Sequence, residues 1–287
     1  NLDFGERSLA RYLSMHGYDV WLFDKRGCGM SEQRGFFSRV RYGWNFDDIA
    51  RFDVPAVIAA VREKTGAAQV HWVGHSEGGL VAYVHLQRPA ARREVASLVA
   101  IGSPGSFRFQ NDLRPLVRFG RWLTPLVALQ GTLAPFLIPW LWLRFLPPGY
   151  LTIFPPNVEF RVLCEALVNL VTNVPRGLFG QYVTWITSGT WRSEDGSSDY
   201  EGGLGKIDVP VFLIAGSADR IVPPASVELV YERIASTQKR FDIVGKGYGE
   251  AEAYGHGDLL VGRNVVAEIF PRIEAWLCAH DSLSSLS

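Results

Sequence analysis

The sequence has few cysteines and no surplus of either charge. Its three cysteines, Cys28, Cys164 and Cys278, are widely spaced, and none forms a zinc pattern such as C-x-x-C. This odd number favours free thiols in a reducing compartment, and therefore a cytoplasmic location. Lys plus Arg and Asp plus Glu both number 29. A nucleic-acid binder normally has a basic surplus, so we expect no nucleic-acid partner.

Lysine is absent between residues 107 and 203, although this segment holds five of the nine tryptophans. The segment also interrupts the alternation of strand and helix patterns on either side of it. We expect residues 107–203 to form a hydrophobic cap or lid, inserted into a core of residues 1–106 and 204–280. The polar stretch Arg192–Gly205 is interpreted as the return from the cap, and residues 281–287 as a disordered tail.

The stretch Trp122–Leu143 has no charged residue over 22 positions, a length that suits a membrane span. However, Pro125, Pro135 and Pro139 interrupt it, and each removes a backbone donor that a lone span cannot replace. The pattern favours short amphipathic cap helices over an apolar acyl pocket. Three alternatives stay open: contact of the cap with a lipid interface, which implies membrane association, a buried core within the cap, and a true membrane span.

Short apolar runs rich in β-branched and aromatic residues are typical of buried parallel strands. Five runs have this pattern: Tyr18–Asp24, Gln69–Val73, Ala96–Ile101, Val209–Ala215 and Arg240–Val244. Helical periodicity is found in Phe46–Lys64, Leu80–Leu86, Ala225–Ile234 and Val265–Leu277. Because strands and helices alternate, we expect an α/β fold whose mostly parallel sheet is covered by helices on both faces.

Residues Gly74-His75-Ser76-Glu77-Gly78 match the pattern G-x-S-x-G between a predicted strand and a predicted helix. The pattern predicts a tight turn that projects the Ser76 hydroxyl above the sheet edge as a nucleophile. We expect side chains at Gly74 and Gly78 to collide with neighbouring backbone, which glycine avoids. The backbone N–H of Glu77 is predicted to stabilise a developing oxyanion. The turn is expected to direct His75 away from the Ser76 hydroxyl, so His75 is not predicted as the general base.

The acid that orients the base is expected after a late strand, because the acid follows the nucleophile along the chain in enzymes with such an elbow. Asp219 ends the turn Gly216-Ser217-Ala218-Asp219, directly after the predicted strand Val209–Ala215. Asp242 and Asp258 stay open as alternative acids, because geometry and not sequence position defines a triad.

The general base is expected after the last predicted strand. His256 lies near the end of the loop Gly245–Gly257, which contains five glycines and can carry an imidazole over the sheet edge toward Ser76. The other histidines besides His75 lie in predicted helices, in a strand or near the tail: His16, His71, His85 and His280. The chain order therefore predicts Ser76, Asp219 and His256 as a catalytic triad.

At these residues the chain resembles the α/β-hydrolase superfamily, and within it the acid and gastric lipases and their bacterial relatives. The stretches similar to those lipases are Tyr18-Asp19-Val20-Trp21-Leu22 with Arg26-Gly27, and Trp44 through Gly66 with Asp53-Val54-Pro55-Ala56. The likeness covers about residues 6–105 and 205–277. It implies an α/β-hydrolase fold with an inserted helical cap, and hydrolysis of hydrophobic, lipid-like esters with neither a metal nor an organic cofactor.

One departure from this family concerns the second donor to the oxyanion. Family members carry a His-Gly or similar motif after an early strand, upstream of the strand that begins at Tyr18. Here His16-Gly17 directly precedes that segment, where it is misplaced for the role. We expect either an N-terminally incomplete sequence or a second donor from elsewhere, and the loss of one donor costs about 10²–10³ in rate.

These observations together predict a serine hydrolase that cleaves carboxylic esters of hydrophobic small molecules through an acyl-enzyme on Ser76. Two alternatives stay open. One is an acyltransferase of the same fold, in which an alcohol or thiol replaces water. The other is a catalytically silent lipid-binding module. The sequence makes no prediction of the oligomeric state.

Overall fold

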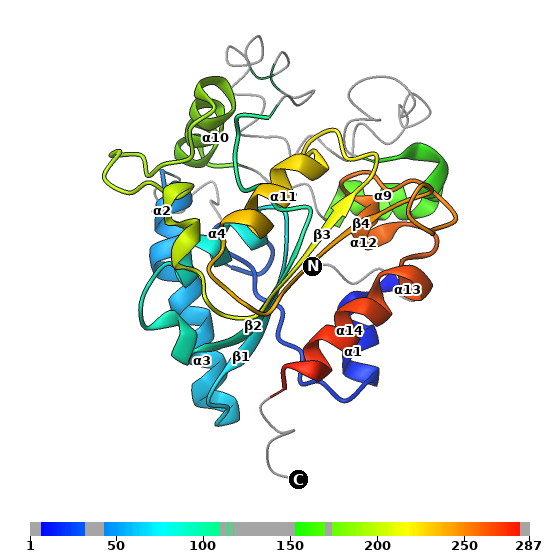
Figure 1. Ribbon diagram of the computed structural model, residues 1–287, viewed down its shortest axis with the longest axis horizontal. Helices are drawn as coiled ribbons and strands as arrows, with labels where there is room; N and C mark the ends of the chain where they lie inside the picture. The colour runs from blue at the N-terminus through cyan, green and yellow to red at the C-terminus, as the bar shows by residue number, and fades with distance from the viewer. Residues whose placement is uncertain are drawn as a thin grey trace.

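A parallel β-sheet forms the centre of the protein (Figure 1). The computed structural model describes residues 7–31, 43–109, 114, 117, 153–169 and 174–281. Its four strands are β1 (Val70–His75), β2 (Val95–Ile101), β3 (Val211–Gly216) and β4 (Lys239–Val244). They lie side by side in chain order, and all three pairings are parallel. Because the strands run the same way, their carboxyl ends meet at one edge, where the predicted site residues follow them.

Helices cover both faces of this sheet (Figure 1). One face is covered by α2 (Phe46–Asp48), α3 (Val54–Thr65), α4 (Glu77–Leu86), α10 (Arg176–Ser188) and α11 (Pro224–Arg233). The other carries α1 (Leu9–Met15), α9 (Phe160–Asn169), α12 (Asp258–Val261), α13 (Val265–Glu268) and α14 (Phe270–Ala279). Short 3-10 turns lie at Ala91–Arg93, Pro155–Asn157 and Gly202–Lys206. The predicted α/β class with two covered faces is confirmed.

The central strands divide their apolar side chains between two hydrophobic cores. On β2, Leu98 and Ala100 face the core on the α4 side, whereas Val99 and Ile101 face the core on the α14 side. Every residue of β3 is buried. This is why these strands read as continuous apolar runs and not as alternating patterns.

The predicted strands Gln69–Val73, Ala96–Ile101, Val209–Ala215 and Arg240–Val244 correspond to β1–β4 within two residues at each end. Two predicted helices are each divided. Phe46–Lys64 contains a π-helical turn, Ile49–Asp53, before α3, because Pro55 has no N–H to continue an α-helical ladder. Val265–Leu277 is divided into α13 and α14 around Ile269, and Pro271 occupies the first turn of α14.

The strand predicted at Tyr18–Asp24 is wrong. The structure assigns no strand there, and Trp21 and Leu22 are 44% and 55% exposed. An apolar groove of about 350 Å³ is lined both by this segment, at Val20, and by β1, at Val73. A strand needs a partner for its backbone N–H and C=O groups, and none of the strands in the described part of the chain pairs with this segment. The Tyr18 N–H donates instead to the carbonyl of Leu13 in α1, at 3.1 Å.

The described part of the predicted cap packs against the rest of the protein. Trp185 of α10 and Trp191 lie in the core on the α4 side, and Val162 of α9 lies in the core on the α14 side. Trp122–Leu143 and residues 282–287 lie outside the described residues, so the expectations for them are not tested. No helix in the described part of the chain is both long enough and apolar enough to cross a membrane. The division into core and cap stays a prediction.

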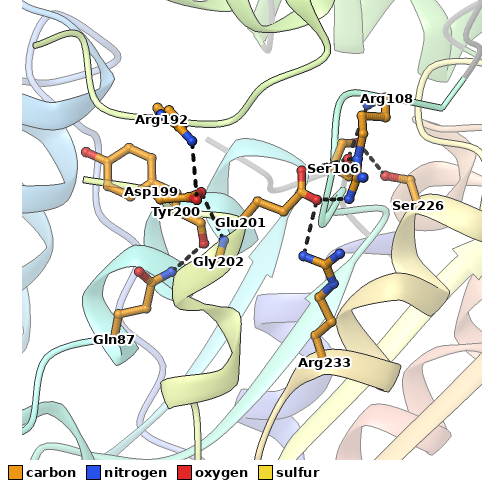
Figure 2. Close-up of polar contacts among 10 residues, drawn as sticks. All are labelled: Gln87, Ser106, Arg108, Arg192, Asp199, Tyr200, Glu201, Gly202, Ser226 and Arg233. Atoms are coloured by element: carbon orange, nitrogen blue, oxygen red, sulfur yellow. Dashed lines mark hydrogen bonds and ion pairs between the residues drawn. The ribbon is translucent and has the colours of Figure 1, made fainter. Parts of the chain in front are cut away.

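The predicted return stretch, Arg192–Gly205, is anchored by a buried carboxylate (Figure 2). Glu201 is 9% exposed and accepts a hydrogen bond from the Ser106 hydroxyl at 2.8 Å. It also pairs with Arg108 and, at 3.2 Å, with Arg233 at the end of α11. These three partners belong to the loop after β2 and to α11, so Glu201 fixes the return stretch to both elements.

Candidate active site

Ser76 is the single residue between β1 and α4. Its φ of 54° and ψ of −113° make it the only non-glycine residue with a positive φ in the described part of the chain. Such a conformation costs of order 1–3 kcal/mol and persists only where the surroundings enforce it. The Ser76 N–H donates to the carbonyl of Ile101 at 2.9 Å, which ties the turn to β2. The local geometry is therefore the strained strand-to-helix turn that the motif predicts.

The two glycines of the motif differ in their surroundings. A Cβ on Gly74 would lie 2.4 Å from the backbone of Gly78, so the expected collision is present at this position. A Cβ on Gly78 would meet no atom within 4 Å outside its own helix among the described residues, so the expected collision with neighbouring backbone is not found there. Gly78 lies in the first turn of α4, and it is its backbone C and O, not its Cβ position, that lie against Gly74. A close approach is found at Gly79 instead, where an added Cβ would lie 2.1 Å from the Ser103 hydroxyl oxygen after β2.

The structure brings Ser76, Asp219 and His256 together, although 180 residues separate the first from the last. His256 Nε2 lies 2.9 Å from Ser76 Oγ, and His256 Nδ1 lies 2.7 Å from Asp219 Oδ2. Because an ionised carboxylate only accepts hydrogen bonds, Nδ1 carries the proton and Nε2 is free to accept one from the Ser76 hydroxyl. This is the geometry of a nucleophile, a base and an orienting acid.

Asp219 is held rigidly in this arrangement. Its side chain is fully buried, and Oδ1 accepts hydrogen bonds from the backbone N–H groups of Ile221 at 2.9 Å and Val222 at 2.7 Å. The carboxylate thus shapes its own turn with one oxygen and orients His256 with the other. Gly102, at φ 56°, passes close to both groups: a Cβ there would lie 3.4 Å from His256 Nδ1 and 3.5 Å from Asp219 Oδ2.

The two alternative acids have other partners. Asp242 forms ion pairs with Arg240 at 2.5 Å and with Arg272 at 3.3 Å. Asp258 is fully buried and accepts from the N–H groups of Gly255 at 2.9 Å and Phe154 at 3.0 Å. Burial raises the pKa of Asp258, and these donors partly offset that rise. Asp258 braces the loop that carries His256, whereas Asp219 contacts the imidazole itself.

The side chain of Glu77 connects three parts of the protein beside the nucleophile. It forms an ion pair with Lys25 and accepts a hydrogen bond from the Tyr182 hydroxyl of α10 at 3.0 Å. Burial, and then the Glu77 charge, raises the pKa of Tyr182 well above its usual range, so its hydroxyl stays a donor. The backbone N–H of Glu77 lies at the start of α4, where the first helical N–H groups have no intrahelical acceptor.

His75 faces the loop that carries His256. Its Nε2 lies 3.0 Å from the main-chain carbonyl oxygen of His256, and the two rings are 4.7 Å apart at an interplanar angle of 45°. Burial, followed by the nearby His256 ring, lowers the pKa of His75 to about 3. His75 is therefore neutral at physiological pH, and its ring does not contact the Ser76 hydroxyl as a base.

The described residues contain no group of three or more His, Cys, Asp or Glu side chains that could hold a metal ion. Cys28 is buried, Cys164 is half-buried and Cys278 is exposed, and these three cysteines form no disulfide in the described part of the chain.

Comparisons with known proteins agree with this fold. A family profile described as alpha/beta hydrolase fold matches residues 2–132. A solved thermophilic esterase from Thermogutta terrifontis has a TM-score of 0.62 at 17% identity, with 96% of this chain and 86% of that chain covered. A monoacylglycerol lipase from Paleococcus ferrophilus has a TM-score of 0.58 at 17% identity, with 95% and 88% covered. The chain has the α/β-hydrolase fold.

In sequence, part of the chain is similar to gastric and lysosomal acid lipases. Human gastric triacylglycerol lipase is 30% identical over 116 residues, which are 39% of this chain and 29% of the lipase. Human lysosomal acid lipase/cholesteryl ester hydrolase is 30% identical over 118 residues, 40% of this chain and 29% of that protein. The predicted resemblance to this group is confirmed, and the chain spans less than a third of the length of these relatives.

Some residues of the site were missed by reasoning from the sequence. Gly102 directly follows β2, and Lys25 directly follows the predicted strand Tyr18–Asp24. Their positions after these segments are the only signal in the sequence that they lie near the carboxyl edge of the sheet. Tyr182 lies in the predicted cap and carries no motif. The contact of His75 with the His256 carbonyl joins positions 181 residues apart, for which the sequence holds no signal.

Proposed function

We propose that the protein hydrolyses carboxylic esters of hydrophobic small molecules through an acyl-enzyme on Ser76. The proposal rests on one observation above all: His256 Nε2 lies 2.9 Å from Ser76 Oγ while its Nδ1 lies 2.7 Å from the buried Asp219. The strained backbone of Ser76 supports it, because strain of this kind is retained mainly at functional sites.

In the first half of the reaction, Ser76 Oγ attacks the ester carbonyl carbon while His256 Nε2 takes the hydroxyl proton. Asp219 stabilises the imidazolium that forms, without itself being protonated. The tetrahedral intermediate then collapses: the bond to the alkoxy oxygen breaks, and that oxygen leaves as an alcohol with the proton from His256. Water, activated by His256 in the same way, releases the acid and restores Ser76.

The negative charge on the tetrahedral oxygen needs donors that are already in place. The Glu77 N–H is one, because it follows the nucleophile at the N-terminus of α4 and the helix dipole adds to its effect. The contacts of the Glu77 side chain with Lys25 and Tyr182 fix the peptide that supplies this donor. No metal or organic cofactor takes part in these steps.

Hydrophobic esters are proposed as substrates because the relatives are named as lipases and esterases and because the segment 107–203 is apolar. The cap is proposed to cover the acyl chain and to contact a lipid interface. The acyltransferase and the silent binding module remain the alternatives that an experiment must separate.

The test is steady-state hydrolysis of p-nitrophenyl esters of short and long acyl chains, with and without added alcohol. We expect turnover by the wild type, a higher kcat/KM for longer acyl chains, and loss of turnover in Ser76→Ala. An ester formed with the added alcohol in preference to free acid would favour the acyltransferase. A folded wild type without turnover on any of these esters would contradict the proposal.

A further inference from the structure

We propose that His75 is a positioning residue for the reaction on Ser76, holding the main chain of His256 through a hydrogen bond from its Nε2 to the His256 carbonyl. The inference rests on the proposed function and adds a residue that contacts neither the substrate nor the reacting hydroxyl. It is based on three contacts of His256: Ser76 and Asp219 hold its imidazole ring, and His75 holds its main-chain carbonyl.

The imidazole of His256 is held by Ser76 and Asp219, but these contacts do not place its backbone. His75 acts on the peptide of His256 itself, with Nε2 3.0 Å from the carbonyl oxygen. A carbonyl oxygen only accepts hydrogen bonds, so Nε2 of His75 must carry a proton. Since His75 and Ser76 are neighbours in the chain, this bond ties the loop of the base directly to the elbow of the nucleophile.

The loop between β4 and α12 needs such a tie. It runs from Gly245 to Gly257 without helix or strand, and Gly245 and Gly249 have φ values of 153° and 110°. It is braced at Tyr254, whose carbonyl accepts from the Ala218 N–H at 2.8 Å, and at Gly255, whose N–H donates to Asp258. These contacts precede His256 in the loop, whereas the bond from His75 acts on the residue that bears the base.

The protonation state of His75 suits this role. Burial lowers the pKa of His75 to about 3, so the ring is neutral over the pH range in which His256 must accept a proton. A neutral neighbour 4.7 Å from the His256 ring donates its hydrogen bond without a positive charge that would oppose formation of the imidazolium.

The experiment compares two replacements of His75. In His75→Gln the amide N–H can occupy the place of Nε2–H and donate to the same carbonyl, whereas His75→Phe keeps a planar ring without the donor. We expect His75→Phe to lose about 10²-fold in kcat with little change in KM, because a displacement of about 1 Å has that effect on rate. His75→Gln is expected to restore most of the lost kcat.

The matched control is His71→Phe. His71 lies on the same strand and lines the same groove, but its Nδ1 is 2.8 Å from the Ser97 hydroxyl and not from the His256 loop. A loss of kcat in His75→Phe but not in His71→Phe, with rescue by glutamine, supports the positioning role. Equal kcat values for the two phenylalanine variants would overturn it while Ser76-dependent hydrolysis by the wild type still stands.

Two outcomes separate this inference from the proposed function. If the wild type hydrolyses no ester, the proposed function fails and the positioning role fails with it. If His75→Phe does not fold, imidazole ¹⁵N NMR of the folded wild type decides the matter. A neutral His75 ring protonated at Nε2 supports the proposal, and a ring protonated at Nδ1 alone overturns it, because it could not donate to the carbonyl.

Discussion

Replacing Gly74 with alanine should destabilise the protein, whereas the same change at Gly78 should not. A Cβ on Gly74 would lie 2.4 Å from the carbonyl carbon and oxygen of Gly78 and 2.6 Å from the Gly79 nitrogen. These are backbone atoms in the first turn of α4, so they cannot rotate away and β1 must separate from the helix. Overpacking of this kind costs about 1–3 kcal/mol, and contact with backbone favours the upper end.

The Gly78→Ala variant is the matched control for stability. It adds the same methyl group within the same motif, but none of the described residues outside α4 has an atom within 4 Å of the new carbon. Because Gly78 is helical, alanine there is expected to stabilise the protein by up to about 1 kcal/mol. Urea unfolding, followed by circular dichroism, gives both free energies of unfolding. If Gly74→Ala proved as stable as Gly78→Ala, the packing of the elbow described above would be refuted.

Four further outcomes are expected. Asp219→Asn should lower kcat by about 10⁴ with little loss of fold, as measured by ester hydrolysis, because the amide favours the wrong tautomer of His256. Tyr182→Phe should lower the free energy of unfolding in urea by about 1–2 kcal/mol, since the half-buried Glu77 carboxylate loses one hydrogen-bond donor but keeps its ion pair with Lys25. Glu201→Ala should lower the free energy of unfolding in urea by about 1–3 kcal/mol (Figure 2). This loss is smaller than for a fully buried ion pair, because Arg108 is half-exposed. The pKa of His75 in the folded protein is lowered to about 3, so between pH 7 and pH 5 only the unfolded protein gains a proton on this ring. The free energy of unfolding of the wild type should therefore fall by roughly 1–2 kcal/mol over this range, relative to His75→Gln. An unchanged difference between the two proteins across that pH range would refute this last prediction.

Much of the fold could be predicted because burial leaves a local record in the sequence. All residues of β3 are buried, so Val209–Ala215 appears as an unbroken apolar run. The segment Tyr18–Asp24 carries a similar pattern but forms no strand, because the pattern records propensity and not the presence of a pairing partner. The breaks within the predicted helices follow from Pro55 and Pro271, which lack the backbone N–H that a continuous α-helix needs.

Some features of the site could likewise be predicted from a local motif, whereas others depend on contacts between residues far apart in the chain. The elbow from Gly74 to Gly78 is a contiguous motif. Asp219 and His256 were predicted from the chain order and from their positions after predicted strands, and the structure places them at hydrogen-bonding distance. The collision at Gly74 could be predicted from the tight turn. The space found beside Gly78 among the described residues depends on the direction of α4, which the motif does not define. The contact of His75 with the His256 loop depends on the packing of residues far apart in the chain.

Labelling with a fluorophosphonate probe, with the modified peptide located by mass spectrometry, tests the central claim most directly. Such probes react with a serine whose hydroxyl is activated by a neighbouring base. We predict a single modification at Ser76 in the wild type, none in Ser76→Ala and a much slower reaction in His256→Asn. A folded wild type that stays unlabelled, or that reacts equally fast without His256, would contradict the account.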